Sequence, residues 1–589
     1  MRKKILKFAV TMTAVALVFA CATAVFAVLF VTQSDDYVPF DQTKLQLQRT
    51  NVKILDLYGN EIDDACEVAS FKSADISTLN EYTANAFVSI EDKRFYKHNG
   101  LDVRRIVGAI VSNIKSMSFK EGASTITQQL IKNTHLTSGK TLKRKINEML
   151  LAHKLEKTLD KKQILETYLN TIYFGRNAYG IEKASAVYFD KSAKDLTLAE
   201  SATLAGMIKA PSTYSPDVHM GKCIERRNLV LKTMLENGFI EEKAYEEAKN
   251  EKLTLANKTV GSMGYVQNTL AQAAELLRIS EKQLLTSNYV IRTYYEPNKQ
   301  NALKEATAKS GKTANANMTA AFVDNKTLGV AACIGNARQR RQVGSTVKPF
   351  AVYAPAFDKL KLTENSLILD EKTNFSGYMP KNFDDKYHGW TTVKAALTQS
   401  YNVPAVKILN SVGLDSACEY MKEMGIKTAT NEQNLSMALG NINGGINCAE
   451  LTQAYATLAN DGNCGQISFI KEISLDKNVV YKHVPKYKKV FSAQAAQAVT
   501  DCLRSAVESG TAHNLSSCNV VVAAKTGTVG TSQGNTDALV CGYTKNGTFT
   551  VWLYSDEMLP NDFTGGTLPT QMASDFLNAV YSKKAKLTR

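Results

Sequence analysis

Three short motifs in the second half of the chain carry residue types that could build one active site for acyl transfer. Ser345-Thr-Val-Lys348 sets an amine three residues after a hydroxyl, Ser400-Tyr401-Asn402 adds a hydroxyl and an amide, and Lys525-Thr526-Gly527 adds a cation. Catalysis through a serine ester needs a nucleophile, a base and a group that holds the substrate. Lys-Thr-Gly occurs once, whereas Ser-x-x-Lys recurs at Ser112, Ser468 and Ser474. Because Ser-x-x-Lys alone is not specific, the order of the three motifs along the chain is the evidence for one active site.

The first two motifs supply the groups for proton transfer. Gly344 permits a tight entry into a helix, and the i+3 spacing puts Lys348 on the same face as Ser345. A lysine in a partly dry site can lose its proton near neutral pH. It can then accept the serine proton, a contribution of about 10²–10⁴-fold. Ser400 and Asn402 can relay that proton and orient a substrate amide.

The third motif follows an apolar run of valine and alanine at 520–524. Such a run predicts a buried strand that presents Lys525, Thr526 and Thr528 at its end. Backbone N–H groups at this end could hold an oxyanion.

A second group of polar residues lies far upstream. Residues 91–100 (Glu-Asp-Lys-Arg-Phe-Tyr-Lys-His-Asn-Gly) are dense in ionisable groups, and 122–130 cluster hydroxyls and amides. Arg144, Lys145 and Glu148 share a helix face. Ordinary alternatives are an exposed, salt-bridged helix end and an intrahelical ion pair worth about 0.3–0.5 kcal/mol. Together the two carboxylates and the cations suit glycosyl transfer from a sugar diphosphate, in which an acid deprotonates the acceptor and cations offset the leaving charge.

The N-terminus predicts a membrane anchor. Four basic residues precede an uncharged, mostly apolar run at 8–32, and two aspartates follow it. About 25 residues at ~1.5 Å each exceed the ~30 Å of a bilayer core, and the basic flank stays inside. A cleaved signal peptide, or lipid attachment at Cys21, remains an alternative, although the apolar run is long for either.

Composition narrows the class of protein. At 589 residues, 44% hydrophobic and 22% charged, the chain is globular and too long for one core. A net charge of +15 fits an anionic membrane face or substrate; no nucleic-acid module supports a nucleic-acid partner. The nine cysteines beyond the apolar run show no Cys-x-x-Cys pair, which disfavours zinc. Cys448–Cys464 and Cys502–Cys518 are candidate local disulfides, and buried free thiols are equally compatible.

The sequence suggests six segments. They are an anchor at 1–32, a stalk at 33–75, a helical domain at 76–250, a linker at 251–300, a mixed domain at 301–575 and a basic tail at 576–589. In the helical domain, 141–159 predicts a helix with an apolar stripe formed by Leu142, Ile146, Met149, Leu150, His153 and Leu155.

The second half resembles the penicillin-binding transpeptidases. The resemblance covers about 300–575 and rests on Gly344-Ser-Thr-Val-Lys-Pro-Phe350, Ser400-Tyr-Asn-Val-Pro-Ala-Val406 and Lys525-Thr-Gly-Thr528. It implies Ser345 as nucleophile, Lys348 as base, Ser400 and Asn402 as helpers, and a carboxylate pocket of Lys525, Thr526, Gly527 and Thr528. Class A β-lactamases share the first and third motifs but typically have Ser-Asp-Asn as the second.

The first half is similar to the glycosyltransferase domain of class A penicillin-binding proteins, which polymerises lipid II. Five matched segments begin at Glu91, Gly122, Arg144, Lys161 and Arg226. The resemblance implies Glu91 as general base on the acceptor 4-hydroxyl and Glu148 as support for the donor diphosphate, with or without a Mg or Mn ion; no other cofactor is expected. The implied substrate-binding residues are Asp92, Phe95, His98, Ser124, Thr125, Thr127, Gln128, Gln129, Lys132, Arg144, Lys145, Tyr168 and Asn170.

The resemblance also implies a fold and partners. We expect a transmembrane helix, a mainly α, lysozyme-like domain, and an α/β (α+β) domain of β-lactamase type with a five-stranded antiparallel sheet and helices. Expected partners are the membrane, lipid II, glycan strands, stem peptides, β-lactam and moenomycin-type inhibitors, and elongation or division proteins. A membrane-dipping surface is expected around Ile110, Val111, Ile114, Met117 and Phe119, unless these residues form ordinary core.

The expected activity is therefore that of a two-domain cell-wall synthase on the outer face of the cytoplasmic membrane. A carboxypeptidase that passes the acyl group to water would use the same site. A non-catalytic sensor is less favoured, because only about seven residues precede the apolar run.

Overall fold

The computed structural model describes Thr32, Gly108 and residues 37–45, 52–62, 73–105, 124–136, 141–176, 178–216, 219–255, 262–308, 316–427, 433–531, 533–556, 558–560 and 562–581. Within these ranges no helix combines the length and apolar character needed to cross a bilayer. The predicted anchor at 1–32, apart from Thr32, lies outside the described residues, as do the membrane-dipping candidates at 110–119 and most of the basic tail.

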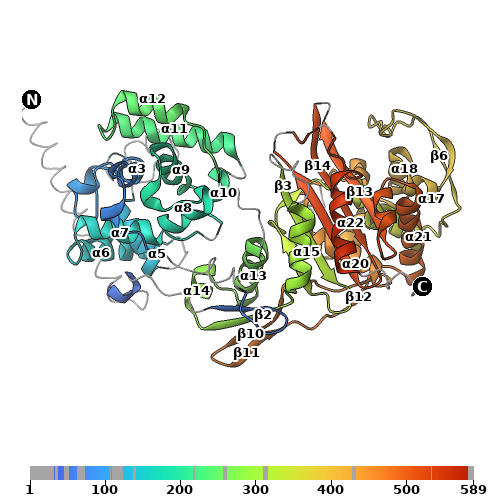
Figure 1. Cartoon of the computed structure of the whole chain (residues 1–589), viewed down its shortest axis with the longest axis horizontal. Coiled ribbons are helices and arrows are strands. Elements are labelled where there is room, and N and C mark those ends of the chain that lie inside the picture. Colours follow the sequence, from blue (N-terminus) through green and yellow to red (C-terminus); the bar gives the residue numbers. More distant parts are fainter. Residues whose placement is uncertain are drawn as a thin grey trace, which may run out of the picture. The chain divides into compact units, whose positions relative to one another are not determined.

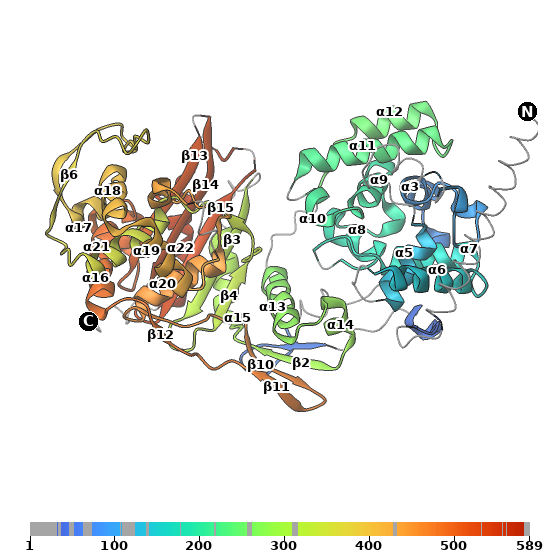
Figure 2. The same cartoon turned by 180° about the vertical axis from the view of Figure 1, so that it is seen from behind.

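The chain forms two compact units (Figures 1 and 2). The first comprises residues 1–49 and 70–257, and the second 50–69 and 258–589. The segment predicted as a stalk therefore contributes to both. Within the first unit Phe40 stacks on His135 with ring centroids 5.4 Å apart. Within the second, the strand β1 (Lys53–Leu55) pairs in parallel with β2 (Tyr289–Thr293).

The first unit is helical. Its main helices begin where the sequence places capping residues: Thr125, Asp160 and Thr197 each close a capping box with the residue three positions later. The helices are α3 (Glu81–Glu91), α5 (Ile126–His135), α6 (Leu142–Glu156), α7 (Lys161–Thr171), α8 (Ile181–Phe189), α9 (Leu198–Met207), α10 (Pro211–Tyr214), α11 (Met220–Glu236) and α12 (Glu242–Asn250), with short 3-10 turns at Gln42–Leu45, Ile76–Thr78, Phe95–Lys97 and Ala193–Asp195.

The second unit is built on a five-stranded antiparallel sheet, as expected. Its order is β13-β14-β15-β3-β4, so β13 is an edge strand. The strands are β3 (Asn317–Asp324), β4 (Val330–Ile334), β13 (Ala523–Thr531), β14 (Gly534–Tyr543) and β15 (Gly547–Tyr554). Phe549 and Val551 face a core shared with α15 (Pro297–Ala308) and α22 (Leu568–Val580). Thr550, between them in sequence, bonds to Thr452 of α20 (Cys448–Ala459), which therefore lies on the opposite face.

Further helices belong to this unit. They are η5 (Gly344–Val347), η6 (Pro349–Tyr353), α16 (Ala354–Lys359), α17 (Val393–Thr398), α18 (Asn402–Val412), α19 (Leu414–Glu423), η8 (Leu435–Leu439), α21 (Ala493–Ser509) and η9 (His513–Ser517). Among them, η5 and α21 contact β13. Short strand pairs complete the unit: β5 (Arg340–Arg341) with β8 (Ile446–Asn447), β6 (Leu367–Asp370) with β7 (Gly389–Thr392), and β9 (Asn463–Cys464) with β12 (Lys488–Lys489).

The segment predicted as a linker, 251–300, is folded. It contains α13 (Ser262–Leu277), α14 (Glu281–Thr286) and β2, and α15 starts within it. β2 pairs with β1 on one side and on the other with β10 (Ile470–Leu475), which continues to β11 (Asn478–Lys482). Tyr265 of α13 is fully buried and donates to Val330 O at 2.7 Å. The polar composition of 251–300 suggested a linker, because β1 and β10, the strands with which β2 pairs, are distant in sequence.

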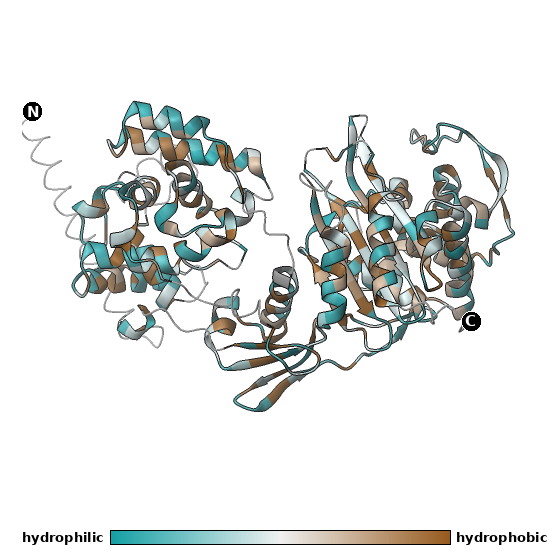
Figure 3. Ribbon diagram, in the orientation of Figure 1, coloured by the Kyte–Doolittle hydropathy of each residue, from teal (hydrophilic) through white to brown (hydrophobic). Residues whose placement is uncertain are grey.

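The ribbon coloured by hydropathy shows hydrophobic and hydrophilic residues interspersed along the helices (Figure 3). In α6 the buried face differs from the predicted stripe. Leu142 is 78% exposed, and Ile146, Met149 and Leu150 are half-buried. His153 is exposed, and of the predicted stripe only Leu155 is fully buried. The other buried residues of α6 are Asn147, Glu148, Leu151 and Ala152. Asn147 and Glu148 are polar yet buried on this face of α6. A search for an apolar stripe cannot find a buried face that contains polar residues.

The candidate disulfides are not formed. Cys448, Cys464, Cys502 and Cys518 are buried free thiols. Burial raises the pKa of Cys448 and of Cys502 to about 12, which disfavours the thiolate. These side chains therefore act as small apolar core residues.

Candidate active sites

The structure brings the first and third motifs into close contact. Ser345 lies in the first turn of η5, preceded by Gly344, whose φ of 53° is unfavourable for other residues. A Cβ on Gly344 would lie 2.8 Å from Thr528 O, and one on Gly527 would lie 2.7 Å from Val343 O. The two glycines therefore allow the backbone of β13 to approach the turn that carries Ser345.

Lys348 lies beneath the second motif and is fully buried. Its Nζ donates to Ser400 O at 2.7 Å and to Asn402 Oδ1 at 2.8 Å, and it lies 3.3 Å from Ser400 Oγ. Burial, and then the nearby Lys525, hold the pKa of Lys348 well below its usual range. An amine one turn from Ser345 is thus prepared to accept a proton.

Lys525 also lies in the interior. It has no exposed area, and burial lowers its pKa to about 7. The strand prediction needs correction here: β13 begins at Ala523, and Val521 is 56% exposed, so Lys525 lies inside the strand rather than at its end. Thr526 donates from Oγ1 to Thr511 Oγ1 at 2.7 Å, and Thr528 Oγ1 accepts from Gly565 N at 3.0 Å.

The second motif has supports that the sequence did not reveal. Ser400 has a φ of 63°, a conformation that costs free energy and needs surrounding contacts to persist. Asn382 Oδ1 accepts from Asn402 N at 2.7 Å, and Asn382 Nδ2 donates to Asp370 Oδ2 at 2.7 Å. His388 stacks on Tyr401 with centroids 4.0 Å apart. No local signature marks these residues, because they meet only when the loop between β6 and β7 folds back on α18.

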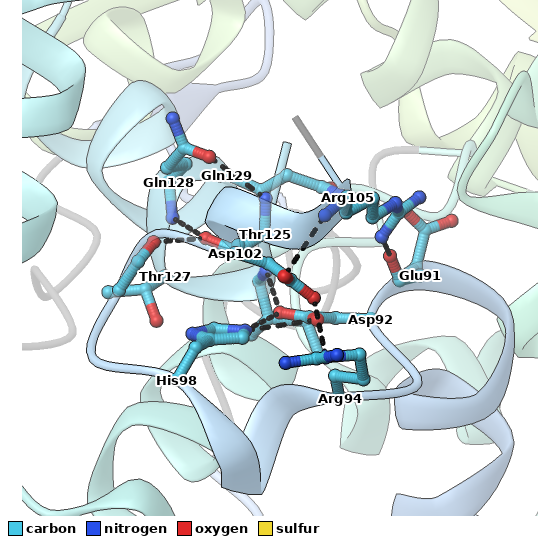
Figure 4. A network of polar contacts seen from close by, with 12 residues as sticks. Glu91, Asp92, Arg94, His98, Asp102, Arg105, Thr125, Thr127, Gln128 and Gln129 are labelled. Atoms are coloured by element: carbon cyan, nitrogen blue, oxygen red, sulfur yellow. Dashed lines mark hydrogen bonds and ion pairs between the residues drawn. The ribbon is translucent and has the colours of Figure 1, made fainter. Parts of the chain in front are cut away.

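In the first unit, Glu91 ends α3 and is oriented by α5 and α7. Gln129 donates from Nε2 to Glu91 Oε2 at 2.6 Å, and Tyr168 donates from its hydroxyl to Gln129 Oε1 at 3.2 Å. Arg105, which the motifs did not single out, donates to Glu91 O at 2.6 Å (Figure 4). Burial and then the Glu91 charge raise the pKa of Tyr168 well above its usual range, so it remains a donor.

The second acid lies beside the neighbouring glutamine. Glu148 is 2% exposed, accepts from Gln128 Nε2 at 3.2 Å and forms a close ion pair with Lys145. Lys145 also donates to Ser124 Oγ at 3.0 Å. Gln128 and Gln129 thus fix the two acids from successive positions of α5. Lys132 lies further along α5 and is exposed. Arg144 lies on α6 and is half-buried.

These donors do not fit a metal ion held by the protein alone. Across the described ranges no three His, Cys, Asp or Glu side chains gather as a metal site. The same carboxylate oxygen of Glu148 already accepts from an ammonium and an amide. We therefore derive no step through a protein-held Mg or Mn ion.

Several predicted substrate-binding residues make structural contacts within the protein. Asp92 accepts from Ile126 N at 3.0 Å and lies 3.0 Å from His98 Nε2 (Figure 4). Thr125 donates to Gly100 O and Thr127 to Glu156, each at 2.6 Å. Phe95 is fully buried. Asn170 uses both amide atoms on the backbone of Ala74, at 2.8 Å each. Their side chains point into the protein and hold the residues that remain accessible.

Two family models match the chain, in the order of the two units. "Transglycosylase" matches residues 53–235, and "Penicillin binding protein transpeptidase domain" matches 297–578. The chain is 36% identical over 561 residues to penicillin-binding protein 1F of Bacillus subtilis (strain 168), covering 91% of this chain and 78% of that protein. The chain belongs to the class A penicillin-binding proteins.

Other relatives agree with this family. Penicillin-binding protein 1A/1B of the same organism is 32% identical over 591 residues, which cover 94% of this chain and 64% of that one. A crystal structure of penicillin-binding protein 1A from Haemophilus influenzae matches 92% of this chain and 93% of its own, with a TM-score of 0.50 and 19% identity, and so supports the fold alone. As a class A penicillin-binding protein, the chain is an enzyme with a glycosyltransferase domain and a D-Ala-D-Ala transpeptidase domain.

Proposed function

We propose that this penicillin-binding protein polymerises lipid II with Glu91 as general base and cross-links stem peptides through an acyl-enzyme on Ser345. The observation that carries the proposal is Lys348, a buried amine of lowered pKa held by the second motif one turn from Ser345. A serine hydroxyl needs an adjacent base to become a nucleophile, and a desolvated lysine is such a base.

In the acylation step, Ser345 Oγ attacks the carbonyl carbon of the penultimate D-alanine while its proton passes to Lys348. The peptide C–N bond then breaks, the amine takes that proton, and the terminal D-alanine leaves. In the second step an amine of a neighbouring strand attacks the ester, and its proton returns through Lys348 to Ser345 Oγ. The close approach of Gly344 to Thr528 favours backbone N–H groups of these two segments as the oxyanion site.

Lys525 is proposed to bind the terminal carboxylate of the donor peptide, with Thr526 and Thr528 beside it. Because burial lowers the pKa of Lys525 to about 7, an arriving carboxylate would favour its charged form. Burial disfavours the charged form of Lys525 in the empty site, and the carboxylate of the bound substrate would favour that charged form again.

In the first unit, Glu91 is proposed to take the proton of the acceptor 4-hydroxyl as the glycosidic bond forms. Gln129 orients the carboxylate. Lys145 and Arg144 offset the charge of the leaving diphosphate, and buried Glu148 holds Lys145 in place. Ser124, through its contact with Lys145, positions the same ammonium.

The surroundings of the enzyme are also part of the proposal. Residues 8–32 would anchor it in the cytoplasmic membrane with both catalytic units outside, because lipid II is held at that surface. β-Lactams would acylate Ser345, moenomycin-type inhibitors would occupy the first unit, and elongation or division proteins would recruit the enzyme.

Two experiments test the roles separately. A labelled β-lactam followed by peptide mass spectrometry should place the adduct on Ser345; an adduct on another residue would reject Ser345 as the nucleophile. Glu91→Gln should abolish polymerisation of purified lipid II and leave β-lactam acylation unchanged, whereas retained polymerisation would remove Glu91 from the base role. Product analysis distinguishes cross-linking from carboxypeptidase release.

A further inference from the structure

The loop between β6 and β7, residues 371–388, is fixed directly to the second catalytic motif. Lys381 O accepts from Asn402 Nδ2 at 2.8 Å, and Asn382 Oδ1 accepts from Asn402 N at 2.7 Å. Further along the loop, His388 stacks on Tyr401. The loop therefore forms part of the wall beside the proposed transpeptidase site.

The inner side of this loop is held by buried polar contacts. Asp370 has no exposed area, and its Oδ2 accepts from Asn382 Nδ2 at 2.7 Å and from His388 N at 3.0 Å. His388 Nδ1 lies 2.8 Å from the same oxygen. Such contacts fix the backbone from which the exposed side chains of the loop project.

Large apolar side chains on this loop, and Trp390 in the adjoining strand β7, are exposed to water. Phe383 is 88% exposed, Trp390 68%, Met379 54% and Tyr387 40%. Phe383 is adjacent to Asn382, and Tyr387 is adjacent to His388, so each exposed ring directly neighbours a side chain that touches the motif. Several exposed apolar side chains on one short segment of fixed backbone indicate a binding surface.

The charges on the loop indicate what kind of ligand fits. Three exposed acids, Glu371, Asp384 and Asp385, balance three exposed lysines, Lys372, Lys381 and Lys386. Several are paired: Lys381 lies 3.9 Å from Asp385, and Glu371 lies 3.1 Å from Lys407. A surface with no net charge offers little to an anionic membrane or a phosphate group. It suits a neutral ligand that has an apolar face and polar edges.

Sugar rings have that character, because the C–H face of a pyranose packs on an aromatic ring while its hydroxyls stay in water. We propose that Met379, Phe383, Tyr387 and Trp390 form a subsite for the sugar rings of the glycan strand that carries the acceptor peptide. The inference rests on the proposed function, since it assigns the acceptor strand to this side of the site. Binding at this subsite would bring the acceptor strand, and with it the attacking amine, next to the second motif.

The two tryptophans of the chain allow a direct test. Trp552 is 2% exposed and Trp390 is 68% exposed, so acrylamide quenching of the full-length protein reports mainly on Trp390. Peptide-free glycan strands should lower the quenching constant, and Phe383→Ala should raise the glycan concentration needed by at least about fivefold, as for loss of an aromatic contact. Tyr58→Ala, which removes a 68% exposed ring elsewhere in the second unit, should change nothing.

A second experiment separates glycan binding at this subsite from the chemistry at Ser345. Phe383→Ala should lower cross-linking of nascent glycan while β-lactam acylation continues at the wild-type rate, because the variant keeps Asn382 and His388, the loop side chains that contact the second motif. Failure of acylation in the wild type would reject the proposed transpeptidase mechanism but leave the quenching result interpretable. The subsite is overturned if glycan gives no protection, or if isolated stem peptides or anionic vesicles protect Trp390 in its place.

Discussion

Lys348 donates from Nζ to Asn402 Oδ1 at 2.8 Å, and Asn402 in turn donates from Nδ2 to Lys381 O at 2.8 Å. The loop at 371–388 thus holds the amide nitrogen of Asn402, and the amide oxygen of Asn402 in turn holds the Lys348 amine. A base must be oriented as well as deprotonated, because proton transfer requires hydrogen-bond geometry. The second motif supplies this orientation.

Asn402→Ala should lower the rate of β-lactam acylation by about tenfold or more, part of the 10²–10⁴-fold that a positioned base contributes. Stopped-flow acylation with a fluorescent penicillin measures this rate. Asn410→Ala is a matched control, because Asn410 is an exposed asparagine at the other end of α18. Equal rates for Asn402→Ala and the wild type would contradict the positioning role.

Asn170→Ala should destabilise the first unit without impairing its chemistry. Removing the amide leaves the buried backbone groups of Ala74 without partners, which costs about 1–3 kcal/mol. Denaturant unfolding measures the loss, and lipid II polymerisation per folded molecule should match the wild type. A variant of normal stability with impaired polymerisation would instead restore Asn170 as a substrate ligand.

Lys145→Met should reduce polymerisation strongly, because it removes the ammonium proposed to face the diphosphate and leaves buried Glu148 without its cation. Lys157→Met, just beyond α6 and exposed, serves as the control. Initial rates of lipid II consumption are the readout. If Lys145→Met polymerises at the wild-type rate, Lys145 does not stabilise the leaving group.

The buried Lys525 should make stability depend on pH. Its folded pKa is about 7, well below that of an exposed lysine, so between about pH 7 and pH 10 the unfolded chain binds a proton that the folded chain has released. Stability attributable to this group therefore increases as pH rises through that window. Lys525→Met should be more stable than the wild type at pH 7, and the difference in melting temperature should shrink toward pH 10. A difference that widens would contradict the assigned pKa shift.

The sequence singled out candidate reacting groups but not their supports. Ser345, Lys348 and Asn402 lie in short motifs, so their types and spacing could be interpreted directly, and the structure shows a hydrogen bond between Lys348 and Asn402. Asp370, Asn382 and His388 are ordinary residues in sequence. Their contacts with the second motif depend on the folding of a long loop, which no local pattern encodes.

Residue type also does not show which polar residues hold the protein together. Thr125, Thr127 and Asn170 are polar and lie in matched motifs, yet their partners are Gly100, Glu156 and Ala74. A polar side chain near an active site can satisfy a buried backbone group equally well, and only the structure shows which partner it has. The buried face of α6 was misassigned for the same reason.

One chain is proposed to make glycan strands and then to cross-link them through Ser345. To test this, purified full-length wild type and Ser345→Ala receive the same lipid II, and glycan chains and peptide cross-links are scored separately. We predict that both proteins make glycan chains at equal rates and that only the wild type makes cross-links. Cross-links made by Ser345→Ala would rule out Ser345 as the acyl carrier.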